Sequence, residues 1–239
     1  MLAFKIIRAG TQAIAEIEGL RSLLFKGIFI NYLIFICLTL ALNGLFFFKF
    51  ISPIIYWVFG YGEGFWASLG NIILWSIQLT FAAVITLISL RFSVEFMYLW
   101  NQCLVKKIIL NFRKVDDKTP SLKYFWKEIK YFFVEALKAC IFPILMLFFG
   151  LIPLIGLPIV FLLESHLLGR QSVIVYLESL TDTKEIDEMN KKMRFIPVRI
   201  GWLATILTFI PIIGWLFLPL VVTYQVIGFA YTREKSRIS

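Results

Sequence analysis

Four long apolar runs divide this chain, and two of them are free of charged and helix-breaking residues. Residues 27–48 and 65–90 contain no charged side chain over 22 and 26 positions. A helix needs about 20 apolar residues to cross the roughly 30 Å of a bilayer's hydrocarbon core. These runs therefore predict two membrane-spanning segments, which lie within long helices at residues 20–48 and 65–110.

The other two apolar runs, residues 139–163 and 200–232, are each interrupted by an Ile-Pro-x-Ile-Gly motif. The first copy occupies residues 152–156, and a further proline follows each copy. Proline inside a helix costs about 3 kcal/mol and glycine about 1 kcal/mol, so both motifs predict breaks. The arms beside each break are too short to cross a bilayer. They predict two hemi-penetrating helical hairpins, at residues 123–163 and 195–232.

The first 19 residues mix apolar and charged positions in the manner of an amphipathic helix. This pattern predicts a helix at the membrane interface over residues 1–19. The whole pattern predicts a single all-α integral membrane domain over residues 1–239. It consists of two long transmembrane helices, two hemi-penetrating hairpins and the N-terminal amphipathic helix.

Composition and charge fix the class of protein and its orientation. The chain is 60% apolar and 16% charged, against about 25% charged residues in soluble domains. Residues 1–26 carry a net charge of +2 and residues 106–138 a net charge of +5, whereas residues 49–70 carry one lysine and one glutamate. Positive residues near membrane spans favour the cytoplasmic side. We therefore expect a multi-pass membrane protein whose N-terminus and C-terminus both lie in the cytoplasm.

The sequence offers no pattern typical of catalysis or of a bound cofactor. The three cysteines are too few and too scattered for a disulfide framework or a zinc site, and no catalytic triad or phosphate-binding loop is present. We therefore expect a protein that is not an enzyme and that needs no cofactor. The basic, aromatic-rich residues 123–138 favour anionic membrane lipid as a partner over nucleic acid.

A candidate anion-binding turn precedes the first long helix and consists of Gly19, Leu20, Arg21 and Ser22. The N-terminus of a helix exposes unpaired N–H groups and a partial positive charge. Gly19 permits close approach of an anion, while the following amides, Arg21 and the Ser22 hydroxyl donate to it. The alternative is that Arg21 only anchors the helix at the lipid headgroups.

Two further groups of polar residues lie close to the apolar runs. Arg91 and Glu95 are four positions apart on one helical face. Within the bilayer they would mark a transport pathway or an oligomer contact, and at its edge an ordinary ion pair. Glu164 and His166 follow the first broken run. They suggest a proton relay, or alternatively a structural role at the interface.

These segments together resemble the CysZ-type sulfate permease family of bacterial inner membranes. The resemblance covers nearly the whole chain. It depends most on four segments, which are residues 19–21, 92–104, 150–158 and 208–219.

The resemblance implies a homo-oligomeric inner-membrane permease that binds sulfate at a Gly-x-Arg-Arg turn. In this chain Ser22 occupies the place of the second arginine, and Lys106 lies where the better-known permeases have an acidic residue. The sequence therefore favours uptake of sulfate or a similar oxyanion through an oligomeric assembly. The alternative is a membrane scaffold of the same family that organises lipid or partner proteins without transporting a solute.

Overall fold

The computed structural model describes residues 2–59, 64–113, 153–180, 195–210 and 213–238, and within these ranges the chain forms helices and short turns. The helical elements are α1 (Leu2–Glu16), α2 (Leu20–Phe46), the π-helical segment η1 (Phe47–Ile51), α3 (Ser52–Phe59), α4 (Phe65–Phe112), α6 (Pro153–Glu178), α8 (Ile196–Thr208) and α9 (Ile213–Ile238). The described part of the chain contains no strand. Four of its helical stretches are long and apolar enough to cross a membrane. The protein is thus an all-helical, multi-pass membrane protein.

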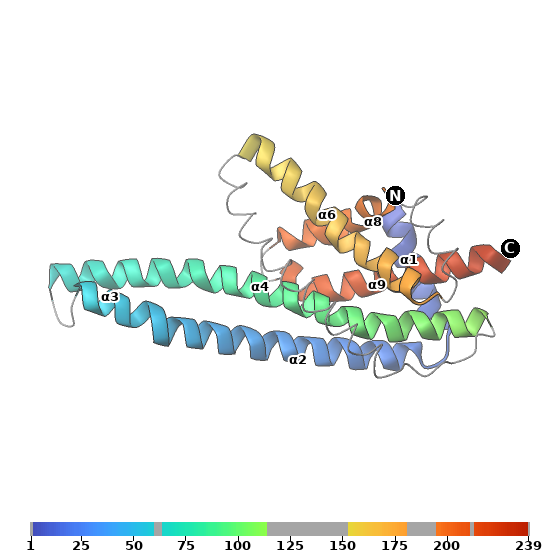
Figure 1. Cartoon of the computed structure of the whole chain (residues 1–239), viewed down its shortest axis with the longest axis horizontal. Coiled ribbons are helices and arrows are strands. Elements are labelled where there is room, and N and C mark those ends of the chain that lie inside the picture. Colours follow the sequence, from blue (N-terminus) through green and yellow to red (C-terminus); the bar gives the residue numbers. More distant parts are fainter. Residues whose placement is uncertain (1, 60–63, 114–152, 181–194, 211–212, 239) are drawn as a thin grey trace.

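Two long antiparallel helices form the axis of the molecule (Figure 1). The first is the continuous run of α2, η1 and α3, and the second is α4, with 48 residues. At 1.5 Å per residue α4 is about 72 Å long, more than twice the hydrocarbon thickness of a bilayer. Residues 49–70, which separate the two uncharged runs, are helical as far as Phe59. Pro53, which has no backbone N–H, is the second residue of α3 and follows the wide turn of η1 after Ser52.

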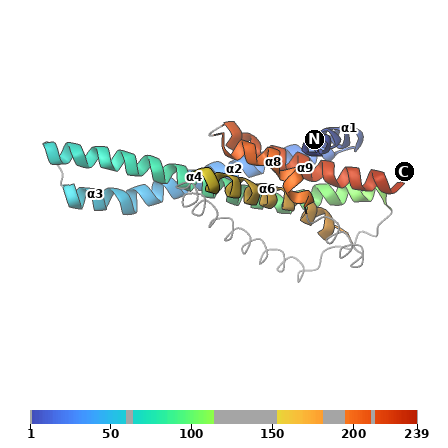
Figure 2. The ribbon, with the colours of Figure 1, turned by 90° about the horizontal axis from the view of Figure 1, so that it is seen from above.

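The remaining helices of the described part of the chain pack around one end of this pair, and none of them covers the other end. Figures 1 and 2 show α1, α6, α8 and α9 beside the first part of α2 and the last part of α4. We call this packed part the body. The projecting remainder, residues 37–59 and 64–89, is called the arm.

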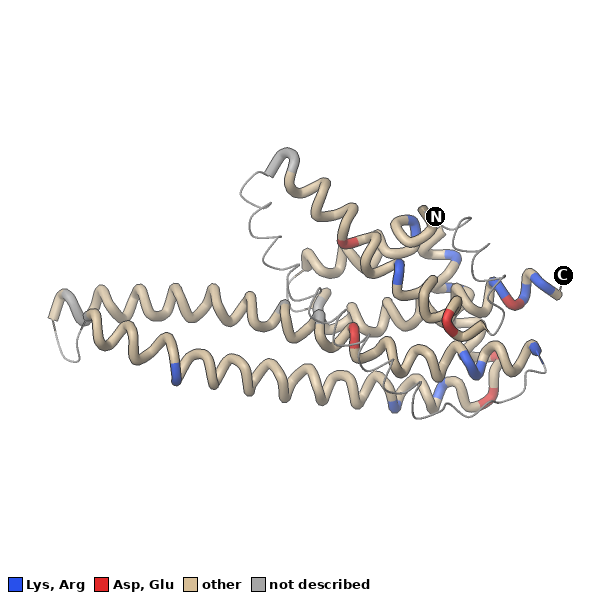
Figure 3. Tube along the Cα trace, in the orientation of Figure 1, with Lys and Arg blue, Asp and Glu red and all other residues tan. Residues whose placement is uncertain are grey.

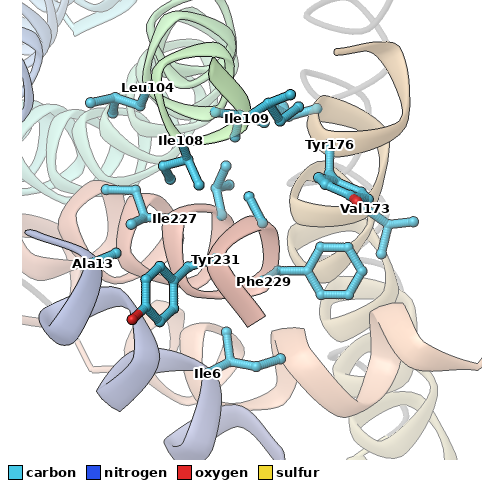
Figure 4. Packing of buried hydrophobic residues seen from close by; sticks show 14 of the residues in the cluster. Ile6, Ala13, Leu104, Ile108, Ile109, Val173, Tyr176, Ile227, Phe229 and Tyr231 are labelled. Atoms are coloured by element: carbon cyan, nitrogen blue, oxygen red, sulfur yellow. The ribbon is translucent and has the colours of Figure 1, made fainter. Parts of the chain in front are cut away.

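Buried apolar side chains hold the body together in two clusters. The large cluster joins α1, α2, α4, α6, α8 and α9, and its members include Ile6, Ala13, Leu20, Leu24, Leu104, Ile108, Val173, Tyr176, Ile200, Ile227, Phe229 and Tyr231 (Figure 4). The small cluster consists of Leu90, Val94, Leu168, Ala204, Leu218 and Val222. Phe35 of α2 packs against the small cluster, which therefore lies nearer to the arm than the large one.

Glycines allow two pairs of helices in the body to touch backbone to backbone. Gly10 of α1 meets Gly228 of α9, and Gly169 of α6 meets Gly201 of α8. A Cβ atom on Gly228 would lie 1.8 Å from a carbonyl oxygen of α1, and one on Gly201 would lie 2.0 Å from a carbonyl oxygen of α6. Small residues at such crossings are typical of helix packing in membranes.

The N-terminal helix has the amphipathic pattern that the sequence predicts, but its buried face is covered by protein. Ala3, Ile6, Gly10 and Ala13 form a buried stripe on α1, and α1 packs mainly on α9. The described residues of α1 thus belong to the body.

Both broken apolar runs continue into helices longer than the sequence predicts. α6 runs for 26 residues through Pro158 to Glu178, and α9 runs for 26 residues through Pro219 to Ile238. Each proline lies within the first two turns, where few backbone hydrogen bonds are lost. The expectation that both second arms are too short to cross a bilayer is therefore wrong. Residues 123–152, which include the first arm of the first predicted hairpin, lie outside the described residues.

Charged residues are confined almost entirely to the body, as Figure 3 shows. Among the described residues of the arm, Lys49 carries the single charge. The arm instead exposes large apolar side chains, including Leu40, Leu45, Phe48, Phe50, Ile54, Trp57, Phe65, Ile72, Trp75 and Leu79. Such a surface is suited to lipid or to another apolar protein surface and not to water.

Candidate functional site

The turn predicted to bind an anion lies where α1 passes into α2. Gly19 has φ of 71°, in the left-handed region that favours glycine, and it precedes the first residue of α2. The N–H group of Leu20 donates to the carbonyl oxygen of Ile17 at 3.2 Å, and that of Leu23 donates to the carbonyl oxygen of Gly19 at 3.2 Å. The amides of Arg21 and Ser22 occupy the first turn of α2, where the helix itself supplies no acceptor.

The four residues of this turn are not equally placed for a ligand. Leu20 is fully buried in the large cluster, so its side chain serves the fold. The side chains of Arg21 and Ser22 are exposed. The Arg21 guanidinium lies 5.7 Å from the centre of the Phe25 ring, one turn along α2. Gly19, Arg21 and Ser22 therefore form an accessible surface, which we call the Gly19 turn.

Lys107 of α4 brings a second positive charge to the Gly19 turn. A Cβ atom on Gly19 would lie 2.5 Å from the Lys107 Nζ atom, so the ammonium group reaches the space that the glycine leaves open. No local pattern in the sequence distinguishes Lys107 from the neighbouring Lys106. The two long helices pair antiparallel, with Trp100 against Gly27 and Phe81 against Phe46.

Arg91 and Glu95, the charged pair predicted from the sequence, lie on α4 beside residues of the small cluster. Glu95 is half-buried and follows Val94 of that cluster. The side chain of Arg91 lies outside the described residues, so the predicted pairing of Arg91 with Glu95 stays a prediction.

Glu164 and Ser165 face α8 in the interior of the body. Both side chains are fully buried. The Thr208 hydroxyl donates to the Glu164 carboxylate at 3.3 Å, and the Ser165 hydroxyl donates to that of Thr205 at 3.0 Å. His166 is half-buried on the same helix. These bonds join α6 to α8.

An ion pair closes the end of the body opposite the arm. The Arg113 guanidinium donates two hydrogen bonds of 2.6 Å to the Glu234 carboxylate, and the Tyr176 hydroxyl donates a third at 2.7 Å. Glu234 is buried, with 1% of its side chain exposed. Its carboxylate raises the pKa of Arg113 above the ordinary value. This network fixes the ends of α4, α6 and α9 to one another.

The described residues contain no group of three or more histidine, cysteine, aspartate or glutamate side chains arranged to hold a metal ion. The arrangement is that of a polytopic membrane protein with a basic, exposed helix N-terminus.

Comparison with known families identifies the kind of membrane protein. Residues 7–219 match the model of the family described as sulfate transporter CysZ/etoposide-induced protein 2.4. The match covers most of the chain, and the protein belongs to this family. No curated protein and no solved structure matches the chain.

Proposed function

We propose that this protein is a permease of the bacterial inner membrane that carries sulfate or a similar oxyanion, with the Gly19 turn as its first binding site. The observation that carries this proposal is the position of the Lys107 ammonium group beside Gly19. Membership of a family named for a sulfate transporter supports the choice of substrate.

The chemistry of the Gly19 turn suits a tetrahedral oxyanion. The first-turn amides of α2 and the partial positive charge of the helix N-terminus attract an anion. Lys107 and Arg21 add two full positive charges from different helices. Arg21 and Ser22 are exposed, so both side chains are free to turn toward a bound ion without disturbing the core.

Lys107 compensates for the serine at position 22. The resemblance implies that relatives place two arginines in this turn, and this chain supplies one, Arg21. Lys107 restores a second positive charge at the same place from α4. The combination of one guanidinium, one ammonium and one hydroxyl group is our proposal for the anion-binding set.

The same proposal keeps a hemi-penetrating turn between α8 and α9 beside the two spanning helices. Its support is the position of the turn between α8 and α9. The Tyr32 hydroxyl of α2 donates to the carbonyl oxygen of Leu216, which places the start of α9 partway along the apolar part of α2. The turn exposes Phe209, Ile210 and Ile213, which are suited to hydrocarbon.

We further propose that the basic body faces the cytoplasm and that the protein works as a homo-oligomer in contact with membrane lipid. The segregation of charge to the body supports the orientation. The exposed apolar side chains of the arm support contact with lipid or with a second copy. In this proposal the solute gradient drives transport and no cofactor takes part.

Uptake of labelled sulfate by reconstituted liposomes tests the function, and two adjacent lysines provide a matched comparison. Lys107→Ala and Lys106→Ala each remove one positive charge from α4, but a Cβ atom on Gly19 would lie 2.5 Å from Lys107 Nζ and has no atom of Lys106 within 4 Å. We expect Lys107→Ala and Arg21→Ala to reduce the initial rate about tenfold, since losing one charge-assisted contact costs about 1.5 kcal/mol or more. Lys106→Ala should retain most of the rate.

Two outcomes would overturn the proposal. The first is equal sulfate accumulation in liposomes with and without the protein. The second is an equal loss of uptake in Lys106→Ala and Lys107→Ala, because only general surface charge would then matter. The melting temperature and the size-exclusion profile of each variant show whether a loss of uptake reflects a loss of folding.

A further inference from the structure

One indole group connects the two long helices close to the Gly19 turn. The indole nitrogen of Trp100 on α4 donates to the carbonyl oxygen of Leu23 on α2 at 2.8 Å. Trp100 is half-buried, and its ring packs against the large cluster. The bond therefore holds one position of α4 against one position of α2.

Gly27 makes room for this indole on the surface of α2. A Cβ atom on Gly27 would lie 2.0 Å from the Cδ1 atom of Trp100 and 2.1 Å from its Nε1 atom. Gly27 follows Leu23 by four positions, which is about one turn of the helix. Its missing side chain thus leaves the Leu23 carbonyl oxygen open to a donor from another helix. A carbonyl oxygen has two lone pairs, so it accepts this bond in addition to the bond within its own helix.

The same register brings Lys107 to the Gly19 turn. Gly19 lies eight positions before Gly27, and Lys107 lies seven positions after Trp100. Two turns of a helix take about 7.2 residues, so in an antiparallel pair these two contacts fall on one line (Figure 1). A Cβ atom on Gly19 would lie 2.5 Å from the Lys107 Nζ atom and has no atom of Lys106 within 4 Å.

Apolar contacts alone would fix this register weakly. Lipid tails replace apolar contacts between helices at little cost, so they oppose a small shift of one helix along another only slightly. A hydrogen bond has a preferred length and direction, and where water is scarce its donor has few other partners. The bond from Trp100 to Leu23 is therefore suited to select one register.

Other polar contacts of α4 lead to α6 and not to α2. The Tyr98 hydroxyl and the Gln102 amide both donate to the Glu178 carboxylate, the amide at 3.2 Å. Tyr98 and Gln102 lie on the side of α4 opposite Trp100, because each residue turns a helix by about 100°. These bonds fix α4 to α6, and they offer a control for the loss of a hydrogen bond that does not involve α2.

We propose that Trp100 is a positioning residue for the Gly19 turn. Its bond to the Leu23 carbonyl oxygen fixes the register in which Lys107, and not Lys106, faces that turn. This inference rests on the proposed permease function and adds to its binding set a residue that does not itself contact the anion. When the indole bond is lost, α4 is no longer held in this register and the ammonium group moves away from the turn.

The reactivity of a thiol placed in the turn measures this register without any transport. The background is the full chain in detergent, with Gly19→Cys introduced and with Cys37, Cys103 and Cys140 replaced by alanine. A positive charge beside a thiol favours the reactive thiolate, so Lys107 should accelerate its alkylation. The reagent is iodoacetamide, which is uncharged, and the rate is measured at neutral pH.

Two lysine variants calibrate this assay. Lys107→Ala should slow the alkylation of Gly19→Cys about threefold or more, because a charge a few ångströms away changes the ionisation of a thiol even where water is present. Lys106→Ala should leave the rate nearly unchanged.

Removal of the indole bond should have the same effect as removal of the lysine. Trp100→Phe keeps an aromatic ring but has no N–H donor, and it should slow the alkylation about threefold. Gly27→Ala, which displaces the indole from the side of α2, should do the same. Tyr98→Phe is the matched control, since it also removes one hydrogen bond of α4 and keeps the ring, but that bond leads to α6. It should leave the rate nearly unchanged.

Uptake of labelled sulfate by the chain with its native Gly19 gives a second readout. Trp100→Phe should raise the sulfate concentration for half-maximal uptake about threefold or more and change the maximal rate little, because it alters the binding set. Lys107→Ala should cost less in the Trp100→Phe background than in the native one, since both changes remove the same charge from the turn. A loss of folded protein would instead lower the maximal rate and leave the two effects additive.

Three results of the alkylation assay would overturn the inference. The first is a rate in Trp100→Phe equal to that of the background, and the second is an equal loss in Tyr98→Phe. The third is a rate that does not depend on Lys107. An unchanged rate in Trp100→Phe together with sulfate uptake defeats this inference and leaves the permease standing. A slowed rate in Trp100→Phe without uptake by any variant defeats the permease and leaves the positioning role standing.

A second pair of positions keeps the test decisive if the melting temperature shows that Gly19→Cys does not fold. The rings of Phe46 and Phe81 lie 5.1 Å apart between centres and belong to the same antiparallel register. Disulfide formation between Phe46→Cys and Phe81→Cys then reports the register. Trp100→Phe should slow it about threefold, because a disulfide tolerates little displacement of its two residues. Equal rates with and without the indole would overturn the inference.

Discussion

The body and the arm of this protein are built from the same two long helices, yet they are stabilised in different ways. In the body, α1, α6 and α9 pack against the two long helices, α8 packs on α6 and α9, and glycines such as Gly201 bring backbones into direct contact. Among the described residues, the two helices of the arm pack only against each other. Their contacts include the aromatic pair of Phe46 and Phe81 and the small group formed by Ile51, Ile55 and Leu74.

This difference follows from the solvent that each region meets. Lipid tails are as apolar as leucine, so an exposed apolar arm has little to gain from further packing. The body carries charged ends and buried polar side chains, which lipid does not satisfy. The body must therefore specify its contacts within the chain, whereas the arm tolerates variation.

The largest difference should appear when the same substitution is made in the two regions. Gly201→Ala places a Cβ atom 2.0 Å from the Ser165 carbonyl oxygen, whereas Gly44→Ala meets no atom within 4 Å. We expect Gly201→Ala to lower the free energy of unfolding by about 3 kcal/mol, the upper end for overpacked cores. Gly44→Ala should change it by about 1 kcal/mol or less, with an increase favoured by helix propensity. Thermal unfolding in detergent, followed by circular dichroism, measures both. Equal losses would show that the close contact of α6 with α8 is not what holds the body together.

The helices were predictable from the sequence because length and the absence of charge are local properties. The start of the first long helix at Leu20 matches the observed element, whereas the second predicted break, from Pro211 to Pro219, is shorter in the structure, because α9 begins at Ile213 and continues through Pro219. The extents of α6 and α9 were not predictable, because they depend on tertiary contacts. Glu164 is the first charged residue after the uncharged run 139–163, which suggests that the chain leaves the membrane there. In the structure its carboxylate instead accepts a hydrogen bond from Thr208 inside the body.

The candidate site was predictable in part for the same reason. Gly19 and Arg21 stand out in the sequence because a helix start has a local signature. Lys107 lies 88 positions after Gly19 in the sequence, and its neighbour Lys106 has the same charge. Only the register of the two antiparallel helices distinguishes the two lysines. The anchor for that register is Trp100, whose indole nitrogen donates to the carbonyl oxygen of Leu23 at 2.8 Å.

A smaller loss should follow when the ion pair at the closed end of the body is removed. Arg113→Ala leaves the buried Glu234 carboxylate without its guanidinium. Breaking a buried pair costs about 3–5 kcal/mol, and because 27% of the Arg113 side chain is exposed we expect about 2 kcal/mol. Arg113→Lys, which keeps the charge but not the two parallel bonds, should lose about half as much. The same unfolding experiment measures both. A loss in Arg113→Lys as large as in Arg113→Ala would indicate that geometry alone, and not charge, stabilises this end.

The smallest effect should come from the arm. The Phe46 ring lies 5.5 Å from the Phe50 ring and 5.1 Å from the Phe81 ring, measured between centres. Phe46→Ala removes both contacts, but lipid or detergent tails replace the lost apolar surface, so we expect a loss of about 1 kcal/mol or less. Phe48→Ala, whose ring is 72% exposed, should change nothing measurable. If Phe46→Ala instead destabilises the protein as much as Gly201→Ala, the arm unfolds together with the body. The pairing of the two long helices would then be as specific as the packing of the body, and the contrast between the two regions would fail.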